Sequence, residues 1–452
     1  MRGELASIVG SQHVLPGTEL AYLEDTTAAR GFRGRADAIA LPGTTEEVAR
    51  VLAWCYGHDV VLTTRGGGTG YAAGAVPIDG GVVLSLERMT RVRRFEPLLW
   101  LINVEAGVRT GDVRRLAREN GLFFPPDPGA SEQSMIGGNI ATNAGGPHAF
   151  KYGVTGRWVT GLEAVVPPGE IVTVGGAIRK DVAGYDLKSL LIGSEGTLGI
   201  ITAAWLRLLP APEVFLPVVA FYDGAAAGCE AIQRILGSGI DAAAIEFLDR
   251  GAVAAAGPAF PGDVPAGAGF MVVAEADGSR EEAARLAAEL AAALGEDALL
   301  VRSPSDPADV AALWRWREGV PFAVASVRGG RVAEDVAVPL DRLAEIVEGT
   351  VEIGKRHGLE ATSWGHAGDG NLHSNFLVRP DDPDEVARAD RAVDDLFDLA
   401  IALGGTISGE HGLGWLKRGH LEKQWGPRAM ELHRQVKQAF DPKNLLNPGK
   451  KA

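Results

Sequence analysis

Two histidines and a Glu-His pair form the most chemically specific set in this sequence of 452 residues. His366 and His373 lie in GHAGDGNLH, and Glu410 and His411 lie in SGEHGLG. Two neutral imidazoles and one carboxylate can hold a divalent metal ion and leave a coordination position open. His411 would then serve as a base, so the set as a whole could activate a hydroxyl group.

A hairpin is the element that would bring the two histidines together. Asp369-Gly370-Asn371 has turn chemistry between two short apolar stretches. The sequence therefore predicts that His366 and His373 lie on opposite arms of a hairpin, within ligand reach of each other. Hydrogen-bonded hairpin histidines without a metal are the alternative, and the glycines on both sides of Glu410-His411 favour a site.

A glycine-rich loop, RGGGTG from Arg65 to Gly70, follows the strand-like VVLTT. Consecutive glycines let backbone N–H groups turn inward and form a nest for a pyrophosphate. The letters from Gly68 also fit the dinucleotide pattern GxGxxA, but a Rossmann turn must open a helix, and YAAGAVPIDGG breaks one. We therefore predict a phosphate loop between two strands, with a structural glycine turn as the alternative.

Two further stretches have the small side chains of a chain that wraps closely round a ligand. PPDPGASEQSMIGGNIATNAGG ends at Gly146 and suits an extended ligand with a flat ring system. KDVAGYDL, which begins at Lys180, leads into LLIGSEGTLGIIT, whose glycines would allow close approach between apolar strands. Ordinary loop structure is the alternative for either stretch alone.

Together, RGGGTG, GGNIATNAGG, GSEGTLGIIT, HAGDGNLH and GEHG resemble the FAD-linked D-2-hydroxyacid dehydrogenases of the vanillyl-alcohol oxidase and p-cresol methylhydroxylase superfamily. This family includes D-lactate dehydrogenase, D-2-hydroxyglutarate dehydrogenase and the flavin subunit of glycolate oxidase. The resemblance implies FAD-dependent oxidation of a D-2-hydroxy acid to the 2-oxo acid, with proton removal by His411 and hydride transfer to flavin N5. The implied metal ligands are His366, His373 and Glu410, and the metal would be zinc, manganese or iron.

The resemblance also implies which residues bind FAD. Gly66 to Gly70 would hold the pyrophosphate, and Asn447 would close the flavin site from the C-terminus. The implied cofactor-binding positions are Arg65, Gly66, Gly67, Gly68, Thr69, Gly70, Pro126, Asp127, Ser131, Gly137, Gly138, Asn139, Ala141, Thr142, Gly145, Gly146, Glu195, Gly196, Ile200, Ile201 and Asn447. Relatives with covalently bonded flavin carry a histidine where this chain has Thr69, so we expect non-covalent FAD.

Substrate binding is implied for Arg317, in LWRWREG, and for Asn375. Arg317 would pair with the substrate carboxylate. Ala333 stands where the hydroxyglutarate enzymes offer a lysine for the distal carboxylate, which favours a lactate- or glycolate-like substrate over hydroxyglutarate. Arg328 or Arg331 could supply the missing charge instead.

Other functions remain as alternatives. The chain could be the flavin subunit of a multi-subunit glycolate oxidase complex, or a transferase like alkylglycerone-phosphate synthase. A non-catalytic flavin-binding subunit is the third alternative. The electron acceptor is open among a quinone, a cytochrome, an electron-transfer flavoprotein and an iron-sulfur subunit.

Composition and charge limit the partners. The formal net charge of -14 argues against nucleic acid, which needs clustered basic residues. The two cysteines favour a reducing compartment over a disulfide, and no apolar run approaches the ~20 residues of a membrane helix. We expect a cytoplasmic protein, at most peripheral at the inner face of a membrane, with a homodimer as one alternative for its oligomeric state.

The expected fold class is α+β. Alternating strands and helices to residue 209 predict a two-part FAD-binding domain, with helices from the capping box at Thr44 to about His58 and over 109–120. Prolines from Pro210 onward mark a boundary, and a helix is expected over 281–294. By resemblance, 210–405 is a ferredoxin-like, antiparallel substrate cap and 406–452 returns to the FAD domain, with the metal and base at the domain interface.

Overall fold

The computed structural model describes residues 1–451, which divide into two compact units. Of these residues, unit 1 comprises Met1–Gly145, Gly153–Ala211 and 410–451. Unit 2 comprises Gly146–Tyr152 and Pro212–Gly409, so the chain enters it twice. None of the helices in residues 1–451 has both the length and the apolar character needed to cross a membrane.

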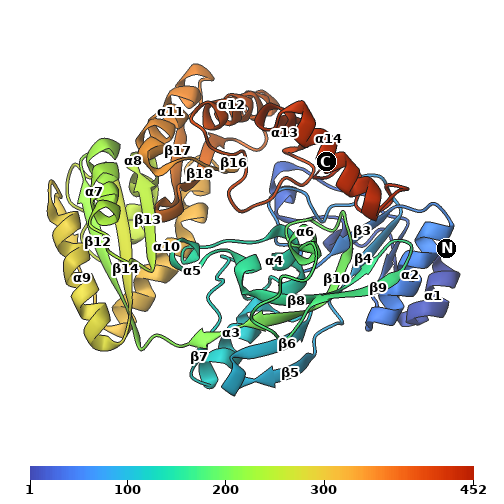
Figure 1. Ribbon diagram of the computed structural model, residues 1–452. Helices are drawn as coiled ribbons and strands as arrows, with labels where there is room; N and C mark the ends of the chain where they lie inside the picture. Colours follow the sequence, from blue (N-terminus) through green and yellow to red (C-terminus); the bar gives the residue numbers. More distant parts are fainter. Residues whose placement is uncertain (452) are drawn as a thin grey trace. The chain divides into compact units, whose positions relative to one another are not determined.

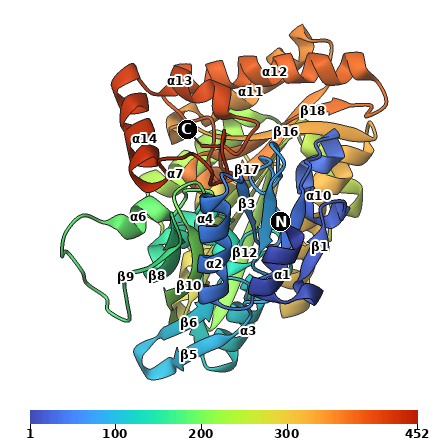
Figure 2. The same cartoon turned by 90° about the vertical axis from the view of Figure 1, so that its right-hand side faces the viewer.

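The first part of unit 1 is a four-stranded sheet with the order β1-β2-β4-β3, in which β4 pairs in parallel with both β2 and β3. The elements are α1 (Arg2–Val9), β1 (Val14–Pro16), β2 (Ala38–Ala40), α2 (Thr45–Gly57), β3 (Leu62–Arg65) and β4 (Val82–Ser85). Helices α1 and α2 lie side by side (Figure 2), and Leu5 and Leu52 share one core with Val82 and Leu84. Helix α2 begins as predicted, because Thr44 accepts a hydrogen bond from the Glu47 N–H at 3.2 Å.

The second part of unit 1 is an antiparallel five-stranded sheet with the order β5-β6-β10-β8-β9. Its strands are β5 (Val92–Glu96), β6 (Leu101–Glu105), β8 (Val159–Val166), β9 (Glu170–Gly175) and β10 (Ile200–Arg207). The other elements of unit 1 are α3 (Thr110–Glu119), β7 (Leu122–Phe123), α4 (Ile136–Thr142), α6 (Leu187–Leu191), β11 (Leu209–Pro210), α13 (Leu421–Gln424) and α14 (Pro427–Phe440).

Two further sequence predictions about unit 1 are confirmed and one is wrong. Helix α3 covers 110–119 where 109–120 was predicted, and residues 66–81 connect the parallel strands β3 and β4 without a helix, so the predicted loop between two strands is present and a Rossmann turn is ruled out. The apolar stretch before GSEGTLG is not a strand but the short helix α6. Asp186 caps this helix by accepting a hydrogen bond from the Ser189 N–H at 3.0 Å, and this local cap prevails over the strand-like composition.

Unit 2 is built on an antiparallel seven-stranded sheet with the order β15-β12-β14-β13-β17-β18-β16 (Figure 1). Its strands are β12 (Val214–Tyr222), β13 (Ala244–Asp249), β14 (Phe270–Gly278), β15 (Leu300–Arg302), β16 (Gly330–Ala337), β17 (Ala361–His366) and β18 (Asn371–Val378). Its helices are α5 (Ala149–Tyr152), α7 (Ala225–Gly237), α8 (Arg250–Ala256), α9 (Arg280–Gly295), α10 (Pro307–Ser326), α11 (Leu343–Arg356) and α12 (Pro383–Ala402).

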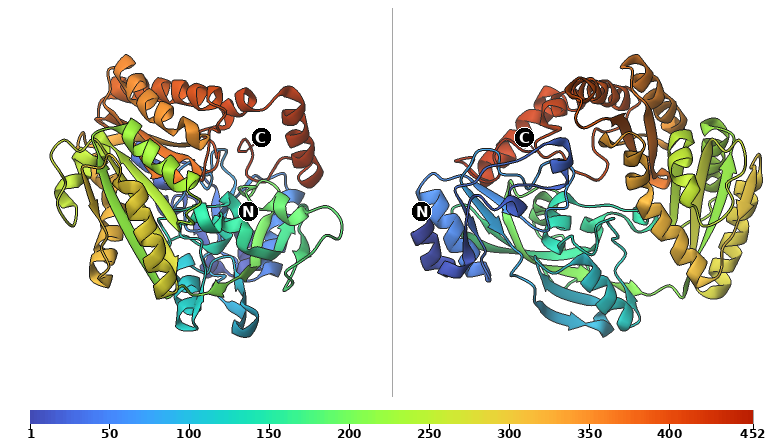
Figure 3. Two further views of the ribbon diagram at one scale, coloured as in Figure 1. Left: turned by 60° about the vertical axis from the view of Figure 1, so that its left-hand side comes forward. Right: turned by 180° about the vertical axis from the view of Figure 1, so that it is seen from behind.

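Helices cover both faces of this sheet (Figures 1 and 3). Helices α8 and α10 pack on one face, where Phe221, Met271 and Trp364 form a core with Val253 and Val320. Helices α7, α9, α11 and α12 pack against the sheet and one another, and α9 covers the predicted span 281–294. The expected α+β fold with an antiparallel sheet in its second part is confirmed.

Short 3-10 helices complete the chain. They are η1 (Ser11–His13), η2 (Leu20–Tyr22), η3 (Thr26–Arg30), η4 (Pro97–Leu99), η5 (Thr155–Trp158), η6 (Gly257–Ala259), η7 (Leu340–Arg342), η8 (Ala367–Asp369) and η9 (Arg418–His420). The turn η8 joins β17 to β18, so the predicted hairpin is confirmed. In its register, His366 pairs with Asn371 and His373 with Trp364, which makes the two histidines diagonal neighbours on one face of the sheet.

Candidate cofactor and metal site

Unit 1 contains an open cavity whose wall is rich in glycine. The predicted cofactor-binding residues that line it are Gly66, Gly67, Gly68, Thr69, Gly70, Gly137, Gly138, Asn139, Ala141, Thr142, Gly145, Glu195, Gly196 and Ile201. Small side chains leave room for a large ligand and bring its atoms close to the backbone. The cavity therefore suits an extended cofactor.

The glycine loop keeps its shape because side chains do not fit at two positions. Gly68 has φ 68°, and a Cβ there would overlap the guanidinium of Arg65. A Cβ at Gly67 would lie 2.4 Å from the carbonyl oxygen of Gln133. Arg65 itself donates a hydrogen bond to the carbonyl of Glu24 at 2.6 Å, so this residue supports the loop from behind.

Helix α4 forms another part of the wall and uses two adjacent glycines differently. A Cβ at Gly137 would lie 2.6 Å from the Cβ of Ala106, so Gly137 permits close packing. A Cβ at Gly138 would meet no atom within 4 Å, although this residue lines the cavity. Any side chain at position 138 would therefore grow into the cavity. This wall fits a large cofactor such as FAD, which would rest directly on it.

Asn447 lies outside the lining and holds two residues that belong to it. Its Nδ2 donates hydrogen bonds to the carbonyl oxygens of Gly74, at 2.9 Å, and Glu195, at 2.8 Å. The Glu195 carboxylate in turn accepts hydrogen bonds from the N–H groups of Leu413, at 2.9 Å, and Gly414, at 2.7 Å. The C-terminal segment is thus tied to the wall of the cavity.

Lys450 is a supporting residue that sequence reasoning missed. Its Nζ donates hydrogen bonds to the carbonyl oxygens of Gly74, at 2.9 Å, and Val76, at 2.6 Å. The side chain is buried, and this burial lowers the pKa of Lys450 to about 7. A lysine in a terminal NPGKK stretch gives no sequence signal of such burial.

Some of the predicted cofactor residues lie elsewhere in the described chain. Asp127, Ser131 and Ile200 are outside the lining but next in sequence to residues that line it, Pro126 lies two positions from the lining residue Pro128, and Gly146 belongs to unit 2. Other lining residues had not been singled out from the sequence, namely Thr64, Tyr71, Ala72, Gly74, Ala75 and Leu86. Tyr71, Ala72, Gly74 and Ala75 follow the glycine loop closely, and the small side chains of the last three were the signal that could have included this segment.

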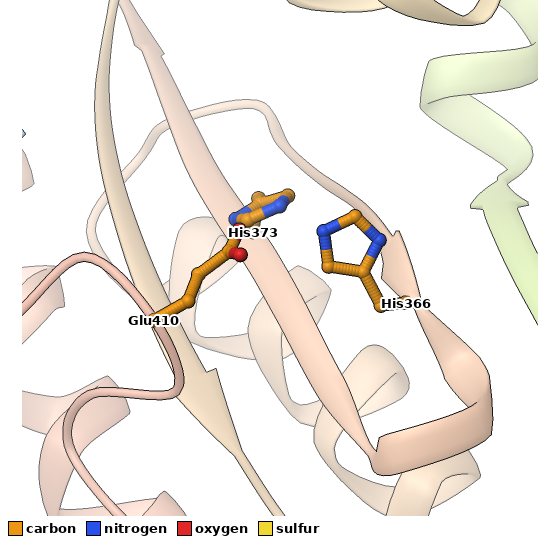
Figure 4. A group of neighbouring side chains, drawn as sticks. All are labelled: His366, His373 and Glu410. Carbon is orange, nitrogen blue, oxygen red and sulfur yellow. The ribbon is translucent and has the colours of Figure 1, made fainter. Parts of the chain in front are cut away.

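The candidate metal ligands meet at one point (Figure 4). Each of His366, His373 and Glu410 offers a ligand atom, and these atoms all lie within 4.8 Å of one another. The histidines come from the β17–β18 hairpin, and Glu410 directly follows Gly409, with which unit 2 ends. Imidazole nitrogens and a carboxylate oxygen are ligands that zinc, manganese and iron accept. The donor set fits a divalent metal.

A buried carboxylate holds His366 in place. Glu246 on β13 is the direct cross-strand neighbour of His366, and its Oε1 lies 2.5 Å from the Nδ1 of His366. Its Oε2 forms an ion pair with the Nη2 of Arg317 at 2.5 Å. Burial opposes ionisation of Glu246, but its interactions with His366 and Arg317 outweigh burial and hold the pKa of this carboxyl below its usual range. With Nδ1 engaged, Nε2 is the His366 nitrogen that can bind a metal.

Glu410 and His411 both line the cavity of unit 1. The ring of His411 stacks on Tyr71, with 4.6 Å between the ring centroids, and its Nε2 lies 3.8 Å from the Oε1 of Glu410. A Cβ at Gly145 would lie 2.7 Å from the Oε2 of Glu410, so a side chain at position 145 would displace this carboxylate. The candidate base and one candidate metal ligand therefore stand at the wall of the cofactor cavity.

The two predicted substrate-binding residues differ in their surroundings. Arg317 on α10 is buried, and its Nε has no hydrogen-bond acceptor in residues 1–451. Asn375 is buried as well, but its Nδ2 donates to the carbonyl of His373 at 2.7 Å and its Oδ1 accepts a hydrogen bond from Arg331. Arg317 thus retains a donor for an anionic ligand, whereas the Asn375 amide is already engaged.

Comparison with known proteins assigns both parts of the chain to flavoprotein families. The family model described as FAD linked oxidases, C-terminal domain, matches residues 211–451, and the one described as FAD binding domain matches residues 36–175. Glycolate oxidase subunit GlcD of Bacillus subtilis is 36% identical over 95% of this chain and 92% of its own length. D-lactate dehydrogenase of Anaerostipes hadrus is 33% identical over 98% and 95%. D-2-hydroxyglutarate dehydrogenase of Xanthomonas citri pv. viticola is 37% identical over 91% and 88%.

Solved structures with the same fold include p-cresol methylhydroxylase with substrate bound, with a TM-score of 0.82 and 18% identity over 99% of this chain and 95% of that one. Alkyldihydroxyacetonephosphate synthase has a TM-score of 0.74 and 18% identity over 99% and 84%. At these identities the likeness shows the fold. The relatives, the family matches and this fold together place the chain in the family of FAD-linked oxidases with the p-cresol methylhydroxylase-type fold, and it is an FAD-dependent oxidoreductase.

Proposed function

We propose that the protein oxidises a D-2-hydroxy acid to the corresponding 2-oxo acid, using non-covalent FAD and a divalent metal ion. The proposal depends on Glu410, which is part of both the candidate metal site and the cofactor cavity. This residue belongs to the His-His-Glu donor set and also lines the glycine-rich cavity, directly before the imidazole of His411. A hydroxyl group held at the donor set would therefore be close to both a base and the cofactor wall.

The residues have distinct roles in this proposal. When bound, FAD would accept a hydride at N5 and the metal would make the substrate hydroxyl more acidic. His366, His373 and Glu410 would hold zinc, manganese or iron. His411 would take the hydroxyl proton, and Arg317 would bind the substrate carboxylate with a charge-assisted hydrogen bond. Because the formal net charge is -14, these local groups would have to attract the anionic substrate.

We assign 1–209 and 406–452 to FAD binding and 210–405 to the substrate cap. Relatives named as glycolate oxidase subunits support the further proposal that electrons leave through a partner chain. The alternative acceptors are a quinone, a cytochrome or an electron-transfer flavoprotein. Purification of the native protein from its own cells tests this point, because a subunit would co-purify with an iron-sulfur protein.

A lactate- or glycolate-like substrate remains the first candidate, because Ala333 offers no cation. One observation favours a dicarboxylate such as 2-hydroxyglutarate as the second. Arg328 is paired with Glu385, whereas Arg331 donates to Asn375 and its guanidinium lies 5.2 Å from the ring centroid of Trp364. Trp364 pairs with His373 in the register, so Arg331 lies on the same face of the sheet as the candidate ligands His366 and His373.

Anaerobic titration with D- and L-lactate, glycolate and 2-hydroxyglutarate tests the reaction through bleaching of the flavin absorbance. We expect bleaching by a D-2-hydroxy acid, and this result would also exclude a transferase without net redox change. The His411→Ala variant should retain FAD and metal but lose rapid reduction. Rapid reduction of this variant would show that His411 is not the base, and no bleaching of the metal-loaded wild type by any of these acids would refute the proposed function.

A further inference from the structure

We propose that Glu246 is a positioning residue that fixes the metal ligand His366 and the substrate-binding Arg317 relative to each other. This inference rests on the proposed function, because it concerns the metal and substrate of that site. It adds a residue to which neither the motifs nor the resemblance gave a role.

One carboxylate serves both side chains through separate oxygens. Oε1 of Glu246 lies 2.5 Å from Nδ1 of His366, and Oε2 lies 2.5 Å from Nη2 of Arg317. The three side chains come from β13, β17 and α10, and Glu246 is 0% exposed. The neighbouring strand therefore fixes the rotation of the imidazole and, through the same group, the position of the guanidinium.

Glu246 determines which nitrogen of His366 is available to a metal ion. A carboxylate on Nδ1 keeps the proton of the imidazole there and leaves the lone pair on Nε2, which is the nitrogen that would coordinate the ion. It also makes that nitrogen a better donor. Loss of such a partner typically weakens metal affinity about 10- to 100-fold.

A contribution to stability does not account for Glu246. Replacing a buried ion pair by apolar residues is often neutral or stabilising, so a need for stability is a weak explanation for Glu246. The Nε of Arg317 has no acceptor in the described chain, which means that the pair leaves a buried donor unsatisfied. A purely structural network would be expected to satisfy that donor, whereas a substrate carboxylate could do so during turnover.

The test is the affinity of the FAD-loaded protein for Mn²⁺, measured by the EPR signal of the unbound ion. Glu246→Gln keeps the side-chain shape and removes the charge, and we expect Mn²⁺ affinity to fall about 10- to 100-fold with FAD content unchanged. Raising Mn²⁺ in proportion should restore flavin reduction at saturating substrate, whereas the KM for substrate should stay above the wild-type value because added metal does not restore the partner of Arg317. Recovery with metal separates positioning from general damage, which added metal would not repair.

Glu275→Gln is the matched control. Glu275 is also buried in the sheet of unit 2, on β14, with its Oε2 2.8 Å from Nε2 of His148 and its Oε1 2.6 Å from Nε1 of Trp314. The Glu275→Gln variant should lose about as much free energy of unfolding as Glu246→Gln, but its Mn²⁺ affinity should be unchanged. Glu246→Gln alone leaves the buried guanidinium of Arg317 without its partner and could fail to fold for that reason. The double variant Glu246→Gln/Arg317→Gln removes this cation and should show the same loss of Mn²⁺ affinity.

The outcomes separate the inference from the proposed function. If the wild type binds Mn²⁺ through His366 and His373 but neither Glu246 variant differs from it by more than threefold, the positioning role is wrong and the metal site stands. An equal loss in Glu275→Gln would also overturn the positioning role. If the wild type itself binds no Mn²⁺, Zn²⁺ or Fe²⁺, the metal-assisted function fails first.

Discussion

Gly138 offers a sharp test of the cofactor cavity, because a side chain at this position should be tolerated by the fold but should hinder binding of the cofactor. A Cβ at position 138 would meet no protein atom within 4 Å, and Gly138 lies in the helix α4. Valine is a better helix former than glycine by about 0.3 to 0.5 kcal/mol. The Gly138→Val variant should therefore fold at least as stably as the wild type in the absence of FAD.

The same substitution should weaken FAD binding by much more free energy than it adds to the stability of the apoprotein. A cofactor carbon resting on the Gly138 Cα would lie about 3.5 to 4.0 Å away, and a Cβ placed about 1.5 Å from that Cα would approach it to about 2.0 to 2.5 Å. FAD would then have to shift by about 1 Å or more along this wall. We expect the dissociation constant of FAD to rise at least 100-fold, which corresponds to about 2.7 kcal/mol.

The assay is a titration of apoprotein with FAD, followed by quenching of flavin fluorescence, together with thermal unfolding of the apo form. Gly3→Val is the matched control, because Gly3 lies in helix α1, has the same open space and is outside the cavity lining. It should leave FAD affinity unchanged. If Gly138→Val binds FAD within threefold of the wild type, the cofactor does not rest on this wall.

Three further predictions concern the same region. Gly145→Ala places a Cβ 2.7 Å from the Oε2 of Glu410, so we expect about tenfold weaker Mn²⁺ binding by EPR titration; unchanged affinity would mean that Glu410 is not a ligand. Because burial lowers the pKa of Lys450 to about 7, the unfolded state binds more protons between pH 7 and about 10, and the free energy of unfolding should rise with pH over this window. Denaturant unfolding should show this rise in the wild type and a smaller one in Lys450→Met, and equal slopes would contradict it. Acid precipitation should release FAD into the supernatant, because Thr69 offers no imidazole for a covalent bond; yellow colour that stays in the pellet would refute this.

Local sequence signals were sufficient to predict those elements whose structure depends on a single short segment. The Thr44 cap predicted the start of α2, and Asp369-Gly370-Asn371 predicted the hairpin that makes His366 and His373 neighbours. The glycine run from Gly66 predicted a loop between strands for the same reason. Family resemblance supplied the cofactor, which composition alone does not reveal.

Features that depend on distant contacts could not be predicted. Residues 146–152 belong to unit 2 although the chain on both sides belongs to unit 1. Lys151 and Tyr152 contact Asp277, more than 100 positions away, and His148 contacts Glu275. Nothing in the local sequence specifies these partners. The support of the cavity by Lys450 depends in the same way on carbonyl groups more than 370 positions earlier.

Glu246 is the case in which the sequence contained a signal that physical reasoning could have used. It lies in AAAIEFL, an apolar run in which every residue of β13 is buried. A carboxylate in such a strand must be paired, because an isolated buried charge costs far more than one side chain can recover by packing. Its partners must then be cationic or proton-donating side chains on neighbouring elements. The sequence could thus predict that Glu246 has a partner, but only the sheet order, which puts β13 beside β17, identifies that partner as the metal ligand His366.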